Sequence, residues 1–211
     1  MKYKAIIFDL DGVICHTDQY HYKAWKLIAD EIGVYFDEAI NNRLRGVSRM
    51  DSFDIILEKY DGSLSKEEKE KYAAKKNDIY RKLLENMSQE DLSSEVKSTL
   101  DLLRSKGLKL GIGSSSKNAK FILERIGLGD YFDGVSDGKN ISKSKPDPEV
   151  FLLAADYLQV RPKDCLVVED AESGIEAAIA GNMDSAAIGD AINCGKANYN
   201  LKSFKDLLEL I

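Results

Sequence analysis

Short apolar runs recur along the chain, and each leads into or follows a segment rich in acids, hydroxyl groups or glycine. The runs lie at Ala5–Phe8, Leu108–Ile112, Cys165–Val168 and Ser185–Ile188. Each is too brief for a helix, and several contain many β-branched residues, which is typical of buried strands. The pattern therefore predicts a strand at each of these places.

Between these runs, apolar residues return at intervals of three and four positions, which is the spacing of an amphipathic helix. Such segments surround Leu100, Ile122, Ala154 and Ile175. Because predicted strands and helices alternate, we expect a mostly parallel sheet covered by helices. The predicted fold class is α/β, with a Rossmann-like core of three α/β/α layers.

Part of the chain breaks this alternation, because it shows successive amphipathic helices and no convincing strand. One predicted helix carries Phe53, Ile56, Leu57 and Tyr60 on one face and ends at Asp61-Gly62. The next opens with Ser65 and Glu68, which have the spacing of a capping box, and continues to Met87. This segment is predicted to be a small helical domain.

The length of the chain agrees with such an insertion. At 211 residues it exceeds one typical domain and is short for two of equal size. We therefore expect a catalytic core formed by residues 1–14 and 91–211, with a helical cap at 15–90 inserted after the first strand.

Composition narrows the possible partners. A formal net charge of -6 argues against nucleic acid, because binding to phosphate backbones needs clustered Lys and Arg. The odd set Cys15, Cys165 and Cys194 has no metal-ligand spacing, which favours a reducing compartment. No targeting pattern is evident, and no apolar stretch approaches the ~20 residues that span a bilayer. We expect a cytoplasmic protein that binds neither nucleic acid nor membrane.

Polar clusters accompany the ends of the predicted strands. Asp9 and Asp11 follow the first strand, Ser114–Ser116 follow the second, and Lys145-Pro146 and Glu169-Asp170 flank later ones. In a parallel sheet flanked by helices, ligands bind outside the carboxyl ends of the strands. The sequence therefore predicts a site at this edge that contains acids, hydroxyl groups and one lysine.

The chemistry of these groups suits phosphoryl transfer. Mg²⁺ prefers carboxylate oxygens, so Asp9, Asp170 and Glu169 are candidate ligands, although a raised pKa on one acid would also relieve their repulsion. Ser114 and Lys145 are suited to hold a phosphate. A carboxylate such as Asp9 is a competent nucleophile toward phosphorus, and Asp11 is placed to act as general acid and base.

Each cluster also has a simpler interpretation when it is taken alone. Asp9-x-Asp11 is commonly a turn or a helix cap, the three serines can cap the next helix, and Glu169-Asp170 can lie in an exposed turn. The functional interpretation rests on their joint occurrence, in order, at one edge of the sheet.

The same motifs resemble those of the haloacid dehalogenase superfamily over essentially the whole chain. They are Asp9-Leu10-Asp11-Gly12-Val13, Ser114, Lys145-Pro146 and Glu169-Asp170 followed by Gly174. The resemblance implies that Asp9 is the nucleophile and Asp11 the acid and base. It assigns phosphate binding to Ser114 and Lys145, and magnesium to Asp9, Glu169, Asp170 and the Asp11 carbonyl.

The cap resembles that of the sugar phosphomutases within this superfamily. This implies the interconversion of β-glucose 1-phosphate and glucose 6-phosphate through glucose 1,6-bisphosphate, with Mg²⁺, a small sugar phosphate as the partner and a monomeric enzyme. The implied substrate-binding residues are Thr17, His21, Trp25, Gly46, Arg49, Ser52, Lys76, Ser115, Ser116, Lys117 and Asn118.

Two alternatives remain open at this point. A sugar-phosphate phosphatase would use the same core and pass the phosphoryl group to water, and the sequence reports water exclusion poorly. A phosphorylated receiver domain for signalling is more remote. Receivers carry their aspartate on a later strand and have no helical cap, so both the position of Asp9 and the inserted segment count against it.

Overall fold

The computed structural model describes residues 2–211, which divide into two compact units. One unit contains the chain up to His16 together with Ser88–Ile211, and the other is Thr17–Met87. These limits lie a few residues from the expected ones. At the first boundary, an isolated β-bridge between Asp11 and Cys15 holds the chain to the first unit beyond residue 14. At the second boundary, Gln89 packs close to Gly127 of that same unit.

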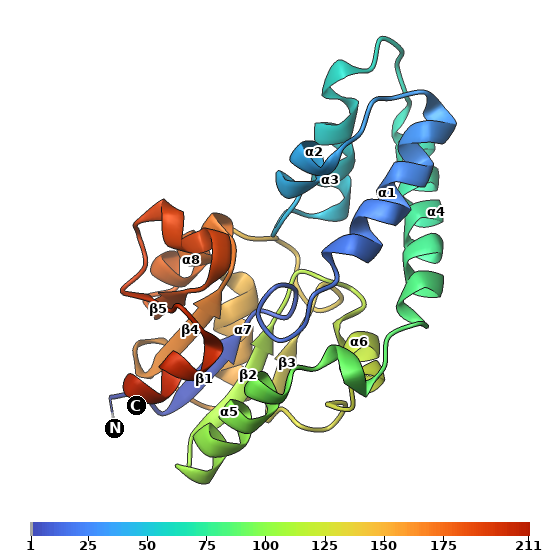
Figure 1. Ribbon diagram of the computed structural model, residues 1–211. Helices are drawn as coiled ribbons and strands as arrows, with labels where there is room; N and C mark the ends of the chain where they lie inside the picture. Colours follow the sequence, from blue (N-terminus) through green and yellow to red (C-terminus); the bar gives the residue numbers. More distant parts are fainter. Residues whose placement is uncertain (1) are drawn as a thin grey trace. The chain divides into compact units, whose positions relative to one another are not determined.

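The first unit is built on a parallel sheet of six strands in the order β3-β2-β1-β4-β5-β6 (Figure 1). The strands are β1 Ala5–Phe8, β2 Lys109–Gly113, β3 Gly134–Ser136, β4 Cys165–Glu169, β5 Asp184–Ala187 and β6 Tyr199–Asn200. All the pairings are parallel, with Phe8 of β1 opposite Ile112 of β2 and Val168 of β4. The predicted α/β class is confirmed, and the apolar run of β1 forms the middle of the sheet.

Four α-helices belong to the described part of this unit. They are α5 Ser94–Ser105, α6 Ala119–Arg125, α7 Glu149–Tyr157 and α8 Glu172–Ala180. Short 3₁₀ turns lie at Gln89–Asp91 (η2), Pro162–Asp164 (η3), Gly189–Cys194 (η4) and Phe204–Glu209 (η5). Helix α5 starts where the Ser93 side chain accepts a hydrogen bond from the Val96 N–H, a standard N-cap.

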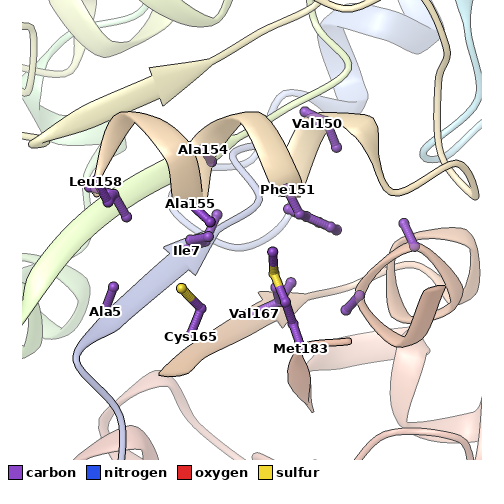
Figure 2. Close-up of a cluster of buried hydrophobic side chains, with 12 residues drawn as sticks. Ala5, Ile7, Val150, Phe151, Ala154, Ala155, Leu158, Cys165, Val167 and Met183 are labelled. Atoms are coloured by element: carbon purple, nitrogen blue, oxygen red, sulfur yellow. The ribbon is translucent and has the colours of Figure 1, made fainter. Parts of the chain in front are cut away.

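Alternate residues of β1 face opposite sides of the sheet, as the two-residue period of a strand requires. Ile7 packs with Val167 of β4 under Phe151 of α7, in a cluster that also contains residues of α8 (Figure 2). Phe8 faces the other way, where its ring lies 5.6 Å from that of Phe204 in η5. Helices and 3₁₀ turns thus cover both faces, which gives the expected three layers.

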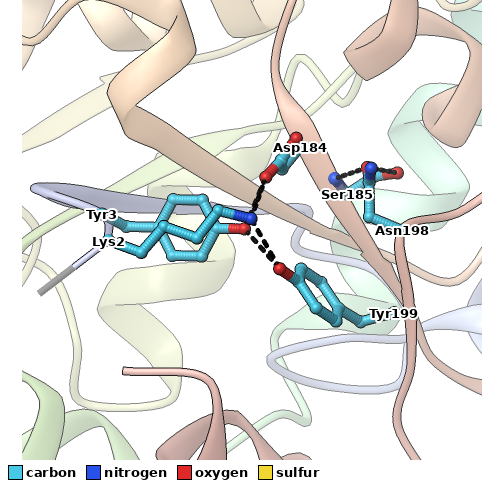
Figure 3. A network of polar contacts seen from close by, with 6 residues as sticks. All are labelled: Lys2, Tyr3, Asp184, Ser185, Asn198 and Tyr199. Atoms are coloured by element: carbon cyan, nitrogen blue, oxygen red, sulfur yellow. Dashed lines mark hydrogen bonds and ion pairs between the residues drawn. The ribbon is translucent and has the colours of Figure 1, made fainter.

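A polar network lies at the amino ends of the strands, which we call the amino edge of the sheet (Figure 3). Lys2 Nζ donates to Tyr199 Oη at 2.7 Å and pairs with Asp184 Oδ2 at 2.8 Å. The Tyr3 hydroxyl donates to Asp184 at 2.6 Å. Next to it, the Ser185 N–H donates to Asn198 Oδ1 at 2.8 Å. These contacts fasten the start of the chain to β5 and to the edge strand β6.

The second unit is helical, as the sequence pattern predicts. Its elements are α1 Asp18–Ile32, α2 Glu38–Asn42, α3 Arg49–Ile56, η1 Leu57–Lys59 and α4 Lys66–Leu84. The capping box of Ser65 and Glu68 is present at the start of α4, which ends at Leu84, short of the predicted Met87. Within residues 2–211, no helix is long and apolar enough to cross a membrane.

Candidate active site

Asp9 is the first residue beyond β1. Its N–H donates to the Val168 carbonyl at 2.9 Å, which extends the β1–β4 ladder by one step past the end of the strand. Asp9 is therefore fixed next to Glu169, the last residue of β4. Because β2 lies on the other side of β1, the segment that begins at Ser114 flanks Asp9 from that side. The topology thus brings three of the predicted clusters to one edge.

Lys145 joins two of these acids. Its ammonium donates to Asp9 Oδ1 and to Glu169 Oε1, and its side chain is only 1% exposed. The ammonium also lies 4.7 Å from the centre of the Phe151 ring. A lysine buried in this way needs nearby negative charge, which the two carboxylates supply.

Burial and the neighbouring charges together control the protonation of Asp9 and Lys145. Burial raises the pKa of Asp9 to about 7, and the charges of Glu169 and Asp11 act in the same direction, whereas Lys145 opposes the shift. Burial alone would disfavour the charged form of Lys145, yet Asp9 and Glu169 outweigh it and raise the pKa of this lysine. A cation near Asp9 would therefore favour its charged form.

Two glycines allow the acids to pack at this edge. A Cβ atom on Gly12, which has φ +90°, would lie 2.1 Å from Asp170 Oδ2. A Cβ atom on Gly174 would lie 2.0 Å from Glu169 Cδ. Both positions therefore exclude any side chain while the acids keep their places. Gly12 and Gly174 belong to the sequence motifs quoted above, but their steric role was not predicted.

Ser114 lies in a tightly bonded loop at the end of β2. Its N–H donates to the Ser136 carbonyl of β3 at 3.0 Å, and its Oγ accepts from the Ser116 N–H at 3.1 Å. Ser116 Oγ accepts in turn from the Asn118 N–H at 3.2 Å. Ser115 Oγ is buried and has no hydrogen-bond partner within residues 2–211, and Lys117 is exposed. The loop is suited to present hydroxyl and N–H groups to an anion.

The acids at the carboxyl ends of β1 and β4 fit a hard divalent cation. Asp9, Glu169 and Asp170 are all buried at this edge, and the buried ammonium of Lys145 pairs with the first two of these acids. Both oxygens of Glu169 accept hydrogen bonds, one from Lys145 and one from the Ala171 N–H. No group of three or more His, Cys, Asp or Glu side chains in residues 2–211 is arranged to hold a metal. Two carboxylates, a main-chain carbonyl and water suit Mg²⁺, which keeps several waters when bound.

The second unit contains a buried lysine of its own. Lys76 is 3% exposed, and its ammonium lies 2.8 Å from His21 Nδ1, 4.5 Å from the Tyr80 ring centre and 5.0 Å from that of Trp25. Burial and the charges of Lys76 and Arg49 place the pKa of His21 well below its usual value. Because a lysine ammonium can only donate, His21 Nδ1 accepts the hydrogen bond from Lys76.

The other predicted residues of this unit have different surroundings. Arg49 Nη2 donates to Asn77 Oδ1 at 2.8 Å, so Asn77 orients a predicted ligand-binding guanidinium, a role that the sequence did not predict. The Trp25 ring stacks on that of Phe53 at 5.4 Å in the apolar core of the unit, and Trp25 is 2% exposed. Thr17 and Ser52 are buried, and Gly46 has φ +71°.

Comparisons with known proteins agree with this description. The chain is 40% identical to the β-phosphoglucomutase of Bacillus subtilis, over 99% of this chain and 93% of that protein. It is 31% identical to a fructose-1-phosphate phosphatase of Escherichia coli, over 89% of this chain and 97% of the other. The crystal structure of β-phosphoglucomutase from Clostridium difficile superposes with a TM-score of 0.90 at 41% identity, and covers 97% of this chain and 93% of that one.

The family model for haloacid dehalogenase-like hydrolases matches residues 3–182, which include every predicted residue of the core site. The match therefore extends over both units rather than over the sheet alone. This chain belongs to the haloacid dehalogenase-like hydrolase family.

Proposed function

We propose that this protein is a magnesium-dependent phosphomutase that interconverts β-glucose 1-phosphate and glucose 6-phosphate. The observation that carries the proposal is the buried Asp9 carboxylate, held by Lys145 beside Glu169 at the carboxyl end of the central strand. The choice of a mutase is supported by 40% identity to a β-phosphoglucomutase over 99% of the chain.

In the proposed reaction, phosphorylated Asp9 donates its phosphoryl group to the free hydroxyl of β-glucose 1-phosphate. The bond from phosphorus to the Asp9 oxygen breaks as the bond to the sugar oxygen forms, and Asp11 takes the hydroxyl proton. The product of this step, glucose 1,6-bisphosphate, turns around in the site. The Asp9 carboxylate then attacks the other phosphorus, Asp11 returns its proton to the departing sugar oxygen, and glucose 6-phosphate leaves with Asp9 phosphorylated again. Ser114 and Lys145 would bind the phosphoryl oxygens.

Asp9, Asp170 and the Asp11 carbonyl would hold Mg²⁺, which when bound supplies positive charge for the phosphoryl oxygens. Glu169 would contribute its negative charge to the metal site, and it would fix Lys145, which donates to Glu169 Oε1. Lys145 in turn keeps Asp9 in one orientation through its hydrogen bond to Oδ1.

A mutase also has to bind the second phosphate of the bisphosphate. The guanidinium of Arg49 is a planar, bidentate donor suited to a phosphate, and its hydrogen bond to Asn77 fixes its orientation. We therefore assign the second phosphate to Arg49. Lys76, Ser52, Ser116 and Asn118 would bind sugar hydroxyls or this phosphate.

A sugar-phosphate phosphatase is the second candidate, because the chain is also 31% identical to a fructose-1-phosphate phosphatase over 89% of its length. The two functions differ in whether water or a sugar hydroxyl receives the phosphoryl group. Incubation with Mg²⁺, β-glucose 1-phosphate and a trace of glucose 1,6-bisphosphate separates them. Glucose 6-phosphate without free phosphate is expected, and free phosphate without glucose 6-phosphate would replace the mutase by the phosphatase.

Arg49→Ala tests the second phosphate position. We expect mutase turnover to fall by about 100-fold, with hydrolysis of p-nitrophenyl phosphate reduced by less than about threefold, because the simple ester has no second phosphate. Arg43→Ala is the matched control, since Arg43 pairs with Glu58 on the surface of the same unit. Equal losses of both activities in Arg49→Ala would contradict the role assigned to Arg49.

A further inference from the structure

The turn that follows β3 packs against the loop that follows β2. Asp137 and Gly138 are buried in it, and the Gly138 N–H donates to the Ser116 carbonyl at 3.2 Å. One residue before the turn, the Ser136 carbonyl accepts from the Ser114 N–H at 3.0 Å. Two main-chain hydrogen bonds therefore tie this segment to the loop that contains Ser114.

The turn has its own internal bonds. The Asp137 N–H donates to Asn140 Oδ1 at 2.9 Å, and the Lys139 N–H donates to Asp137 Oδ1 at 2.8 Å. The Asn140 N–H donates to the Asp137 carbonyl at 3.0 Å. Because each bond restrains the one next to it, the Gly138 backbone has a defined position against the loop.

Gly138 approaches this loop more closely than a side chain would permit. A Cβ atom there would lie 2.3 Å from the Ser115 carbonyl oxygen and 2.9 Å from the Lys117 nitrogen, both main-chain atoms. The φ of Gly138 is not in the left-handed region, so alanine would meet no backbone strain of its own. Glycine is therefore required at this position because the two backbones lie too close together for a side chain.

We infer that Gly138, held by the Asp137–Asn140 turn, is a positioning residue that sets the location of the Ser114–Asn118 loop and so its affinity for the transferring phosphoryl group. The inference rests on the proposed function, in which Ser114 binds that group. A shift of the loop by about 1 Å moves its donors away from the phosphoryl oxygens, and misplacement of this size costs up to about 100-fold in rate.

Gly138→Ala tests the inference, with Gly129→Ala as the matched control. The control makes the same chemical change in the same unit, where a Cβ atom would lie at an ordinary 3.4 Å from Glu124 Cγ. Four quantities are measured for each variant: the inhibition constant of inorganic phosphate, kcat/KM for β-glucose 1-phosphate, the Mg²⁺ concentration at half-maximal activity, and the midpoint of thermal unfolding.

For Gly138→Ala we expect the inhibition constant of phosphate to rise by about tenfold and kcat/KM to fall by about 10–100-fold. The Mg²⁺ requirement is expected to stay within twofold of wild type, roughly, because Asp9 and Asp170 follow other strands. Gly129→Ala should match wild type in all four quantities. General loosening of the unit would instead change phosphate inhibition, Mg²⁺ requirement and unfolding together.

Asn140→Ala keeps the test decisive if Gly138→Ala does not fold. Asn140 is exposed, and its replacement removes the side-chain bonds to the Asp137 N–H and to the Ser136 hydroxyl and adds no atom. A rise of about threefold in the inhibition constant of phosphate, at unchanged Mg²⁺ requirement, supports the inference. If Gly138→Ala folds and phosphate inhibits it as it inhibits wild type, the inference is overturned. If Gly138→Ala does not fold, the same result for Asn140→Ala overturns the inference.

Ser114→Ala distinguishes failure of this inference from failure of the proposed function. If Ser114→Ala weakens phosphate inhibition and Gly138→Ala does not, the role of Ser114 stands and the inference alone is overturned. If Ser114→Ala leaves phosphate inhibition unchanged, the proposed phosphate binding by Ser114 is overturned, and the inference with it.

Discussion

The two edges of the sheet each carry a lysine between oxygen partners, and they differ in exposure to water. At the carboxyl edge, the Lys145 side chain is 1% exposed and binds Asp9 and Glu169, which are buried as well. At the amino edge, the Lys2 side chain is 58% exposed and binds Asp184, with Tyr199 as a second partner. The same kinds of groups are thus placed in two different dielectric environments.

Exposure decides what each network can do. Water screens the pair at the amino edge, so it fastens β5 and β6 and contributes little free energy. Burial at the carboxyl edge raises the pKa of Asp9 to about 7 and makes the charges depend on one another. A network of this second kind is suited to bind and transfer a charged group. It also makes the fold sensitive to the loss of the shared cation, Lys145.

Asp9→Asn is expected to have the largest effect on activity. It removes the proposed nucleophile, so kcat should fall by more than about 10⁴-fold, measured as the formation of glucose 6-phosphate. The midpoint of thermal unfolding should change little, since Asn is nearly the same size and Glu169 still pairs with Lys145. Asp184→Asn at the amino edge is the control and should retain full activity. Residual turnover of Asp9→Asn above about 1% of wild type would contradict Asp9 as nucleophile.

Lys145→Met is expected to have the largest effect on stability. It leaves Asp9 and Glu169 buried together without their shared cation, so the free energy of unfolding should fall by about 3–5 kcal/mol. Urea unfolding with a chelator present measures this loss, and added Mg²⁺ should restore part of it. Lys2→Met is the matched variant at the exposed network, where the loss should be much smaller and should shrink with added salt. Similar losses at both lysines would refute the contrast between the edges.

Tyr3→Phe is expected to give the smallest effect. The substitution removes the hydroxyl that donates to Asp184 at 2.6 Å, and the free energy of unfolding should fall by about 1 kcal/mol. Activity should be unchanged, because the carboxyl edge is untouched.

The pH dependence of this small loss has a definite sign. Hydrogen bonds from Lys2 and Tyr3 lower the pKa of Asp184 from its ordinary value of 3.8. The stabilisation is therefore present above pH 3.8 and is lost as the pH falls through the lower pKa of the folded state. The difference between wild type and Tyr3→Phe should be constant near neutral pH and should shrink in acid. A difference that grows in acid would contradict the shift.

Much of the fold was predictable because its strands are buried and apolar. The runs at β1 and β4 were predicted nearly to the residue, and the capping box at Ser65 is confirmed. The strands β3 and β6 were missed. Gly134–Ser136 and Tyr199–Asn200 are short and not apolar, so pairing with a neighbouring strand, rather than local preference, determines their conformation.

The acids and the lysine of the core site were predictable because parallel strands bring their carboxyl ends to one edge. The sequence could not predict which oxygen accepts from which donor, as the two hydrogen bonds of Glu169 show. The need for glycine at Gly12 and Gly138 was not predictable either, because it arises from distances between segments far apart in the sequence. Asn77 was missed for the same reason, since its partner Arg49 comes from another helix.

The position of β1 in the middle of the sheet has a consequence for local unfolding. The strand is paired on both sides, with β2 and β4, whereas β6 is a two-residue strand at the edge. Amide hydrogens of Ile7 and Phe8 should therefore exchange with deuterium only through the rarest openings of the unit, and those of β6 far sooner. The carboxylate of Asp9 is thus anchored to the part of the sheet that opens last, so fraying of the outer strand leaves it in place.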